Sequence, residues 1–387
     1  MKITYTARRL YTPLEEVDRP CIVVEDGSIV EVFAHSEREI PAGGAVRDLG
    51  DCALAPGFLD VHMHGGAGLD LMRAPAADVP RLGKFLASHG VTSYFPTTVA
   101  APLDTTCSAL ERLADAIEAA AQCEHAEGAR PIGIHLEGPY LSHKRRGVHP
   151  PENLLNPTAV TFDRLCQAAR GHVRMMTIAP ELPGAIEVIG EAARRNVCVS
   201  IGHSDADLTT AQNAVEAGAR HATHTFNAMR PLDHRDPGII AEVLTDHRLT
   251  ADIIVDGIHV SPPVVEIFMK TKGVEHAVLI TDCISATGMP DGQYQLGPIL
   301  VDVKDGKCTA NGSLAGSVLT MDRAVRNVTQ FAAWSLKDAV RAASLNPARA
   351  VGLAEKQGKI TAGARADFVA LNAGGEVVKT VIGGREV

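Results

Sequence analysis

The sequence predicts an α/β protein built on a (β/α)8 barrel of the TIM type, with a small β-sandwich domain formed from both chain ends. Two patterns support this prediction. Eight apolar β-type segments alternate with helical patterns over about 300 residues, and short β-type runs occur at both ends but not in the middle. We expect residues 1–54 and 358–387 to form the small domain and residues 55–357 to form the barrel.

The small domain is predicted from the similar texture of the two ends. Near the start, CIVVEDGSIVEV indicates a hairpin, because Asp26 and Gly27 suit a tight turn. Near the end, GKITAGARADFVALN and EVVKTVIGGREV have the same short apolar runs. Strands this short are only marginally stable alone, so both ends are expected to share one β domain.

The barrel strands are expected at LAPGFLDVHMH, TSYFPTTV, RPIGIHLEGP, VRMMTIAP, VCVSIGHS, HATHTF, LTADIIVDG and AVLITD. Helical patterns such as TTCSALERLADAIEAAAQ, GAIEVIGEAARR and LTTAQNAVEAGA follow them. An open doubly wound sheet is the alternative architecture. It is disfavoured because no GxGxxG phosphate turn follows the first strand.

Composition excludes several classes of protein. The net charge of −9 and the isoelectric point near 6.0 argue against a nucleic-acid or acidic-membrane partner, since both require a basic surface. The eight cysteines contain no CxxC pair, which is typical of reduced thiols rather than a disulfide framework. No stretch approaches the roughly 18 apolar residues of a membrane helix. We therefore expect a soluble, cytoplasmic protein.

Six side chains of the metal-ligand type fall at the ends of the predicted strands. His62 and His64 end the first strand two residues apart, so both imidazoles point to the same face. Barrel enzymes carry their chemistry at the carboxyl ends of their strands, where all six would converge. The set is His62, His64, Glu137, His203, His224 and Asp282.

Each of these residues also has a structural interpretation. An isolated histidine such as His203 is often a hydrogen-bonded core residue. Glu137 could belong to a buried ion pair, and Asp282 could cap a helix. All six interpretations would have to coincide at one end of one barrel, so the pattern favours a metal site.

The ligand set combines nitrogen and carboxylate without cysteine, which suits zinc, iron or another divalent first-row metal. One ion is expected on Glu137, His203 and His224. His62 and His64 allow a second ion, with Glu137 as the bridge. Two ions sharing one water would lower the pKa of that water and polarise a bound carbonyl.

Asp282 is expected to be the general base. A carboxylate beside the metal accepts a proton from the attacking water and returns it to the departing amine.

Several motifs occur together along the chain: PGFLDVHMHG, HLEGPYLS, RRGVHP, IGHSDAD, THTFNAM, VDGIHVSP, TDCISATGMPDG and LAGS. In this order they resemble the N-acetylglucosamine-6-phosphate deacetylases of the amidohydrolase superfamily, from about residue 50 to GKITAGARADFVAL. The first motif is general to the superfamily, whereas HLEGP, THTFNAM and VDGIHV are narrower. The resemblance implies a barrel with a small β domain, and hydrolysis of the acetamide of N-acetyl-D-glucosamine 6-phosphate.

The resemblance also implies roles for single residues. It places metal binding at Glu137, His203 and His224 and catalysis at Asp282. Arg235 matches an arginine that reaches the phosphate in a neighbouring subunit, which implies a homodimer. The positions that match substrate contacts are His149, Asn227, Ala228, Arg235 and His259.

These substrate contacts have structural alternatives. Arg235 lies in the charged segment DHRD, where a solvated arginine is the default, and His149 and His259 could be structural. Both histidines lie on predicted loops at the active rim, which favours function. GSLAGS is implied to approach the substrate through its backbone, although a glycine-rich turn explains it equally well.

One or two metal ions are both compatible with this sequence, because some relatives lack the first-strand histidine pair.

The sequence also leaves other activities open. The chain has Glu137 where related hydrolases use a carboxylated lysine, which disfavours dihydroorotase-like and hydantoinase-like activities. The alternatives are deacetylation of another amino-sugar phosphate such as the galactosamine isomer, hydrolysis of an N-acyl amino acid, or a non-enzymatic scaffold. The presence of all six candidate ligands argues against the scaffold.

Overall fold

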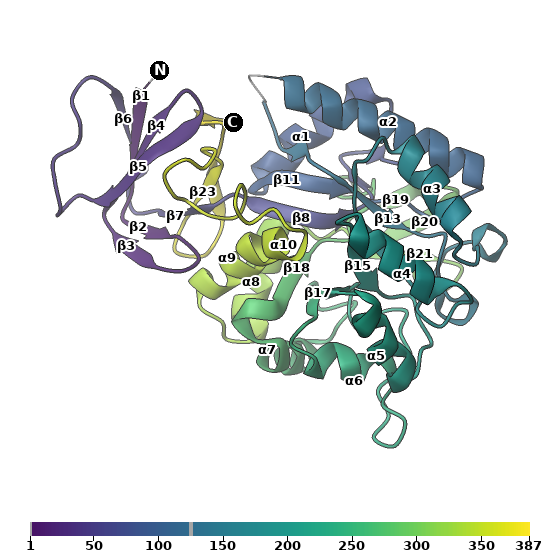
Figure 1. Cartoon of the computed structure of the whole chain (residues 1–387). Helices are drawn as coiled ribbons and strands as arrows, with labels where there is room; N and C mark the ends of the chain where they lie inside the picture. Colours follow the sequence, from purple (N-terminus) through teal and green to yellow (C-terminus); the bar gives the residue numbers. More distant parts are fainter. Residues whose placement is uncertain (1, 124–126) are drawn as a thin grey trace.

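Parallel strands organise the fold of the computed structural model, which describes residues 2–123 and 127–387 (Figure 1). One parallel sheet has the order β12-β11-β8, and a second has the order β13-β14-β15-β16-β17-β18. Their strands are β8 (Phe58–Met63), β11 (Val91–Pro96), β12 (Arg130–Pro131), β13 (Ile134–Glu137), β14 (Val173–Ile178), β15 (Cys198–Ile201), β16 (His221–Ala222), β17 (Thr250–Ile254) and β18 (Ala277–Ile280). Each of the eight predicted barrel segments overlaps one of these nine strands, except that RPIGIHLEGP contains both β12 and β13.

Backbone hydrogen bonds link the two parallel sheets at both edges. The N–H of Thr98 donates to the carbonyl of His135 at 3.1 Å, which joins the end of β11 to β13. The N–H of Asp282 donates to the carbonyl of His62 at 2.9 Å, which joins the end of β18 to β8. Because the pairing is parallel, the carboxyl ends of these strands open at one rim.

Helices cover the outer faces of the strands (Figure 1). In α4 the buried residues are Ala185, Val188, Ile189 and Ala192, the spacing of one apolar helix face. The helices are α1 (Val79–Ser88), α2 (Leu103–Gln122), α3 (Ala159–Ala168), α4 (Ala185–Arg194), α5 (Leu208–Ala217), α6 (Gly238–Thr245), α7 (Pro262–His276), α8 (Met321–Phe331), α9 (Leu336–Ala343) and α10 (Leu345–Ala350). None in the described part of the chain is long and apolar enough to cross a membrane.

Strands from both chain ends lie together beside this body (Figure 1). They form one sheet of order β5-β4-β1-β6 and another of order β25-β24-β23-β7-β2-β3. The rings of Tyr5 and Phe368 pack edge to face at 5.1 Å, so residues from the two ends share a core. The bounds are β1 (Lys2–Thr6), β2 (Arg9–Tyr11), β3 (Glu16–Asp18), β4 (Pro20–Glu25), β5 (Ser28–Ala34), β6 (Ala45–Asp48), β7 (Ala53–Pro56), β23 (Phe368–Leu371), β24 (Val377–Ile382) and β25 (Arg385–Glu386).

The hairpin predicted at the start of the chain is confirmed. β4 pairs antiparallel with β5 around Asp26 and Gly27. Their φ angles are 47° and 80°, and two positive values are what the tight type I′ hairpin turn requires.

A small antiparallel sheet between β18 and α8 was not predicted. Its strands are β19 (Gly292–Leu296), β20 (Ile299–Lys304), β21 (Lys307–Ala310) and β22 (Ser313–Leu314). The sequence signal was present, because Ile299, Val301 and Val303 alternate with exposed residues along β20. The remaining short elements are β9 (Gly65–Gly66), β10 (Leu69–Asp70) and three single turns of 3-10 helix at Ala76–Asp78, His143–Arg145 and Pro151–Asn153.

Candidate metal centre and substrate pocket

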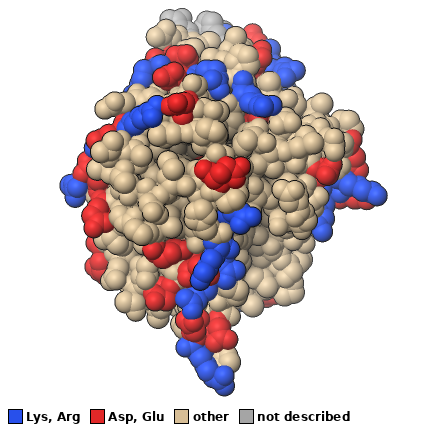
Figure 2. Space-filling view, turned by 90° about the vertical axis from the view of Figure 1, so that its right-hand side faces the viewer, with Lys and Arg blue, Asp and Glu red and all other residues tan. Residues whose placement is uncertain are grey.

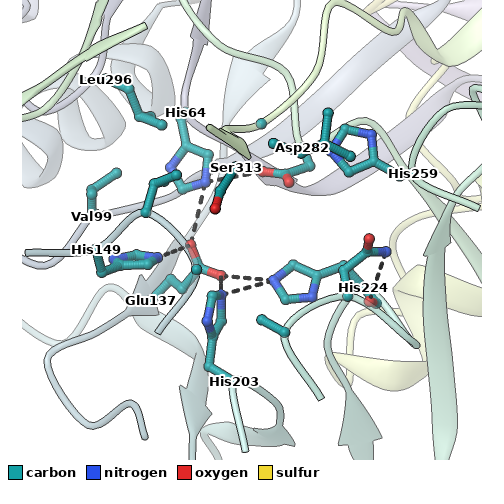
Figure 3. A pocket seen from close by; sticks show the side chains of 16 residues that line it. His64, Val99, Glu137, His149, His203, His224, His259, Asp282, Leu296 and Ser313 are labelled. Atoms are coloured by element: carbon teal, nitrogen blue, oxygen red, sulfur yellow. Dashed lines mark hydrogen bonds and ion pairs between the residues drawn. The ribbon is translucent and has the colours of Figure 1, made fainter. Parts of the chain in front are cut away.

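A cavity of about 330 Å³ opens where the parallel strands end (Figure 3). Ten of the eleven predicted site residues lie in it or directly beneath it. His62 lies beneath it, fully buried. The predicted residues that line the cavity are His64, Glu137, His149, His203, His224, Asn227, Ala228, His259 and Asp282.

Glu137, the last residue of β13, lies between two pairs of histidines. Its Oε1 atom is 3.2 Å from Nε2 of His203 and 3.2 Å from Nε2 of His224. Its Oε2 atom is 3.3 Å from Nε2 of His64 and 3.6 Å from Nε2 of His62. The carboxylate therefore presents one oxygen to each pair, as Figure 3 shows for three of these histidines.

Asp282 lies next to His62 and His64, the histidine pair of the first barrel strand. Its Oδ1 atom lies 3.1 Å from Nε2 of His64 and 3.5 Å from Nε2 of His62. These three residues present ligand-type atoms within 4.8 Å of one another, and all three are buried.

The backbone is held in an unusual conformation at three of these positions. His203, His224 and Asp282 each lie two residues beyond the end of their strand, and their φ angles are 46°, 29° and 49°. A residue other than glycine in this region costs on the order of 1–3 kcal/mol, and such residues cluster at functional sites. For His224, the buried carboxylate of Asp252 accepts the backbone N–H, which helps to hold this conformation.

The carboxylates are ionised at neutral pH. Burial raises the pKa of Glu137, but the histidines around it outweigh burial and hold that pKa well below its usual range. Burial also raises the pKa of Asp282, but His62 and His64 bring it down to about 2. Burial lowers the pKa of His64, but hydrogen bonds and charge interactions with the two carboxylates raise it to about 10. The centre thus attracts positive charge strongly.

These residues fit a divalent metal ion. The Nε2 atoms of His62 and His64 are 3.3 Å apart, and those of His203 and His224 are 3.1 Å apart. Two imidazole nitrogens that face each other so closely need a proton or a cation between their lone pairs. One proton can lie between only two nitrogen atoms, whereas a metal ion accepts several nitrogen and carboxylate lone pairs at once.

Backbone partners determine which histidine nitrogen is available. Nδ1 of His64 contacts the carbonyl of Thr97 at 3.2 Å, and Nδ1 of His203 contacts the carbonyl of Arg145 at 2.8 Å. A carbonyl only accepts, so both Nδ1 atoms carry a proton and donate. In the neutral imidazole Nε2 is then bare, as a metal ligand must be.

His149 has the opposite arrangement. It comes close enough to Glu137 and His203 to belong to a ligand group. However, its Nδ1 accepts a hydrogen bond from the backbone N–H of Ala100, so Nε2 carries the proton. Burial lowers the pKa of His149 to about 3, so the ring is neutral. His149 is therefore a hydrogen-bond donor to the cavity, and we assign the position beside His203 to His224.

The remaining predicted contacts lie on the opposite wall. His259 donates from Nδ1 to Asp256 at 2.7 Å, which directs its Nε2 edge towards the cavity (Figure 3). Asn227 and Ala228 follow His224 on the same connection, between β16 and α6, and line the cavity.

Arg235 does not lie in the cavity of its own chain. It is exposed in the segment between β16 and α6, which projects from the body (Figure 1). Figure 2 shows the charged projection at the bottom of the turned view.

The amidohydrolase family model matches residues 53–387. The chain belongs to the amidohydrolase family.

Two curated relatives of this amidohydrolase are similar over most of its length. The N-acetylglucosamine-6-phosphate deacetylase of Bos taurus is 39% identical, with 88% of this chain and 85% of the relative covered. The N-acetylgalactosamine-6-phosphate deacetylase of Escherichia coli O157:H7 is 37% identical, with 98% and 97% covered.

A solved structure is also similar to this amidohydrolase. It is a mutant N-acetyl-D-glucosamine-6-phosphate deacetylase from Mycobacterium smegmatis in complex with N-acetyl-D-glucosamine-6-phosphate. Its TM-score is 0.92 at 35% identity, with 100% of this chain and 99% of that chain covered.

The cavity of this amidohydrolase also contains residues that the sequence did not single out. Val99 and Leu296 provide apolar walls, and Gly147 lies on the loop that carries His149. The GSLAGS segment, which the resemblance implied would approach the substrate, also lines the cavity, through Ser313, Leu314 and Gly316. Leu296 ends β19, so the alternating pattern of the small sheet was the signal that could have located this wall.

Proposed function

We propose that this chain is a metal-dependent hydrolase that removes the acetyl group from N-acetyl-D-glucosamine 6-phosphate, giving glucosamine 6-phosphate and acetate. The observation that carries the proposal is Glu137, whose two oxygens each face a pair of histidines beside Asp282. The similarity to deacetylases that act on this class of substrate supports it.

We propose that His203, His224 and Glu137 would hold one divalent ion, and that His62, His64 and Asp282, next to the other carboxylate oxygen of Glu137, would allow a second. Zinc and iron suit this set of nitrogen and carboxylate ligands. When bound, the metal supplies Lewis acidity and lowers the pKa of a water molecule.

The side chains of the site then act on the substrate and its water. Asp282, ionised at neutral pH, accepts the proton of the attacking water and delivers it to the departing amine nitrogen. His149 donates from Nε2 to the acetamide oxygen, on which negative charge develops during attack. His259, Asn227 and Ala228 contact the sugar phosphate.

Arg235 completes the phosphate contact from a second copy of the chain, and we therefore propose a homodimer. Its exposed position outside its own cavity supports this arrangement. A guanidinium suits a phosphate because it forms charge-assisted hydrogen bonds in a fixed geometry.

We also propose that the chain forms a closed barrel and a separate small β domain. The bonds at both edges of the parallel sheets support a closed (β/α)8 barrel over residues 55–357. The shared core of the two chain ends supports a β-sandwich domain of residues 1–54 and 358–387. The eight free cysteines support a reducing, cytoplasmic location.

The test is release of free amine from N-acetylglucosamine 6-phosphate by the purified protein, before chelation, after chelation and after metal is restored. The unphosphorylated sugar and the galactosamine isomer serve as parallel substrates, the latter because of the Escherichia coli relative. We expect release that requires both phosphate and metal, and that is fastest with the glucosamine isomer. Faster turnover of the galactosamine isomer would reassign the substrate, and no release with any metal would refute the deacetylase.

A further inference from the structure

The loop that follows β13 wraps around the imidazole of His203. The N–H of Ser142 donates to the carbonyl of His203 at 2.9 Å, and Nδ1 of His203 donates to the carbonyl of Arg145 at 2.8 Å. Gly147 packs against the ring so closely that an added Cβ atom would lie 3.2 Å from Cε1 of His203. The orientation of this imidazole therefore depends on the position of the 142–147 loop.

An ion pair fixes this loop. Nε of Arg145 donates to Oδ1 of Asp205 at 2.8 Å, and the side chains of Arg145 and Asp205 are 32% and 18% exposed. Asp205 lies two residues beyond His203, so the ion pair of Arg145 and Asp205 joins the loop to the segment that carries His203. Lys144 contacts the other oxygen of Asp205 at 3.1 Å, but its side chain is 78% exposed, and such pairs contribute little.

Asp205 is itself held by the neighbouring strand connection. Glu181, which follows β14, accepts the backbone N–H of Asp205 at 2.6 Å and the hydroxyl of Ser204 at 2.7 Å. Three successive loops of the rim are thus tied to one another around His203.

Among the other three histidines of the centre, His64 has a comparable bond, from its Nδ1 to the carbonyl of Thr97 at 3.2 Å. Nδ1 of His224 and Nδ1 of His62 have no hydrogen-bond partner among the described residues. Within the pair of His203 and His224, only His203 therefore has a hydrogen bond at Nδ1 to another described residue, and this bond fixes its orientation.

We propose that Arg145 and Asp205 are positioning residues for the metal centre. Their ion pair holds the Arg145 carbonyl in place, the carbonyl fixes the proton of His203 on Nδ1, and Nε2 is thereby directed at the metal. The same loop carries His149, so one ion pair aligns a metal ligand and a substrate donor. This inference rests on the metal centre of the proposed function.

The test measures metal affinity by competition of Zn²⁺ between the purified protein and a chelator. Arg145→Gln and Asp205→Asn are each expected to bind about 10–100-fold more weakly than wild type, the usual effect of removing support for a metal ligand. Arg145→Lys should recover part of the loss. Lys144→Gln, which removes only the exposed partner of Asp205, is the matched control and should stay within about twofold of wild type.

A second measurement separates positioning from unfolding. Each variant is loaded with Co²⁺, whose absorption in the visible range reports the ligand geometry, and thermal unfolding of the metal-free proteins reports the fold. If Asp205→Asn does not fold, the metal affinity of Arg145→Gln alone tests the inference. Wild-type affinity in Arg145→Gln, or an equal loss in Lys144→Gln, would overturn the inference. A wild-type protein that binds metal without releasing amine would refute the deacetylase and leave the positioning role intact.

Discussion

The backbone N–H of Ala100 donates to Nδ1 of His149 at 3.2 Å, and this bond distinguishes His149 from the histidines beside it. We expect both His149→Gln and His149→Asn to keep their metal, because Nε2 of His149 carries a proton and is not a ligand. His149→Asn should lose about 10²–10³-fold in kcat, the usual effect of removing a donor to a developing oxyanion. Glutamine should retain more activity because its amide N–H can reach the cavity. Metal content and kcat are measured together, and loss of metal in either variant would contradict the assignment.

Replacement of the proposed general base tests the chemical step. In Asp282→Asn the amide cannot accept the proton of the water, so kcat should fall about 10²–10⁴-fold. Binding of the phosphorylated substrate should persist, because the proposed contacts to the sugar phosphate come from other side chains. Steady-state kinetics and calorimetric binding measure the two effects. Asp104→Asn, on the exposed side of α2, is the control, and near-native turnover in Asp282→Asn would refute the role.

The proposed second metal ion rests on the two oxygens of Glu137, each of which faces a pair of histidines. We expect the fully reconstituted protein to bind two ions per chain and the double variant His62→Gln with His64→Gln to bind one. His203→Asn should lose the other ion. Metal analysis of the dialysed proteins gives the stoichiometry, and an equal metal content in wild type and the double variant would establish a single-ion centre.

Arg235 is expected to act on the site of a second chain. Arg235→Gln should raise KM for the phosphorylated substrate about 10–100-fold, because a charge-assisted hydrogen bond contributes about 1.5–3 kcal/mol. His234→Gln in the same exposed segment is the control. Mixing Arg235→Gln subunits with Asp282→Asn subunits should restore a low KM, since each mixed dimer contains one complete site. Failure of the mixture to recover would place Arg235 outside the neighbouring site.

Acid stability depends on a group far from the metal centre. Burial raises the pKa of Asp322, but His89, Thr320 and Arg326 outweigh it and bring that pKa down to about 2. Because the folded pKa lies below the ordinary 3.8, the stabilisation of about 2 kcal/mol is present above pH 4 and is lost as the pH falls towards 2. Thermal unfolding across this range should show a smaller pH dependence in Asp322→Asn than in wild type. Identical curves would contradict the expectation.

Much of the fold could be predicted because its signals are local. The parallel strands lie in short segments of mainly apolar residues, and the first hairpin has two residues that tolerate positive φ. The small sheet of β19 to β22 was not predicted, although β20 alternates between buried and exposed residues, because this segment lies outside the alternation of barrel strands and helices.

The site could be predicted only as a set of residues. The ligand-type side chains stand out because each lies at or just beyond the end of a buried strand, although their roles stay predictions. The sequence could not tell that His149 donates while His203 presents a bare nitrogen. That difference comes from the backbone groups of Ala100 and Arg145, and a backbone amide or carbonyl has no signature in residue type.

The pairing of β7 with β23 has a consequence for the order in which the chain becomes structured during synthesis. Leu54 pairs with Ala370, more than 300 residues later. At about 5–20 residues per second, roughly 15–60 s pass on the ribosome between these two residues. During that time one edge of β7 lacks its final neighbour, and Tyr5 lacks the ring of Phe368. The nascent protein therefore carries an open strand edge while the whole central body is made, and an open edge is a template for pairing with another chain.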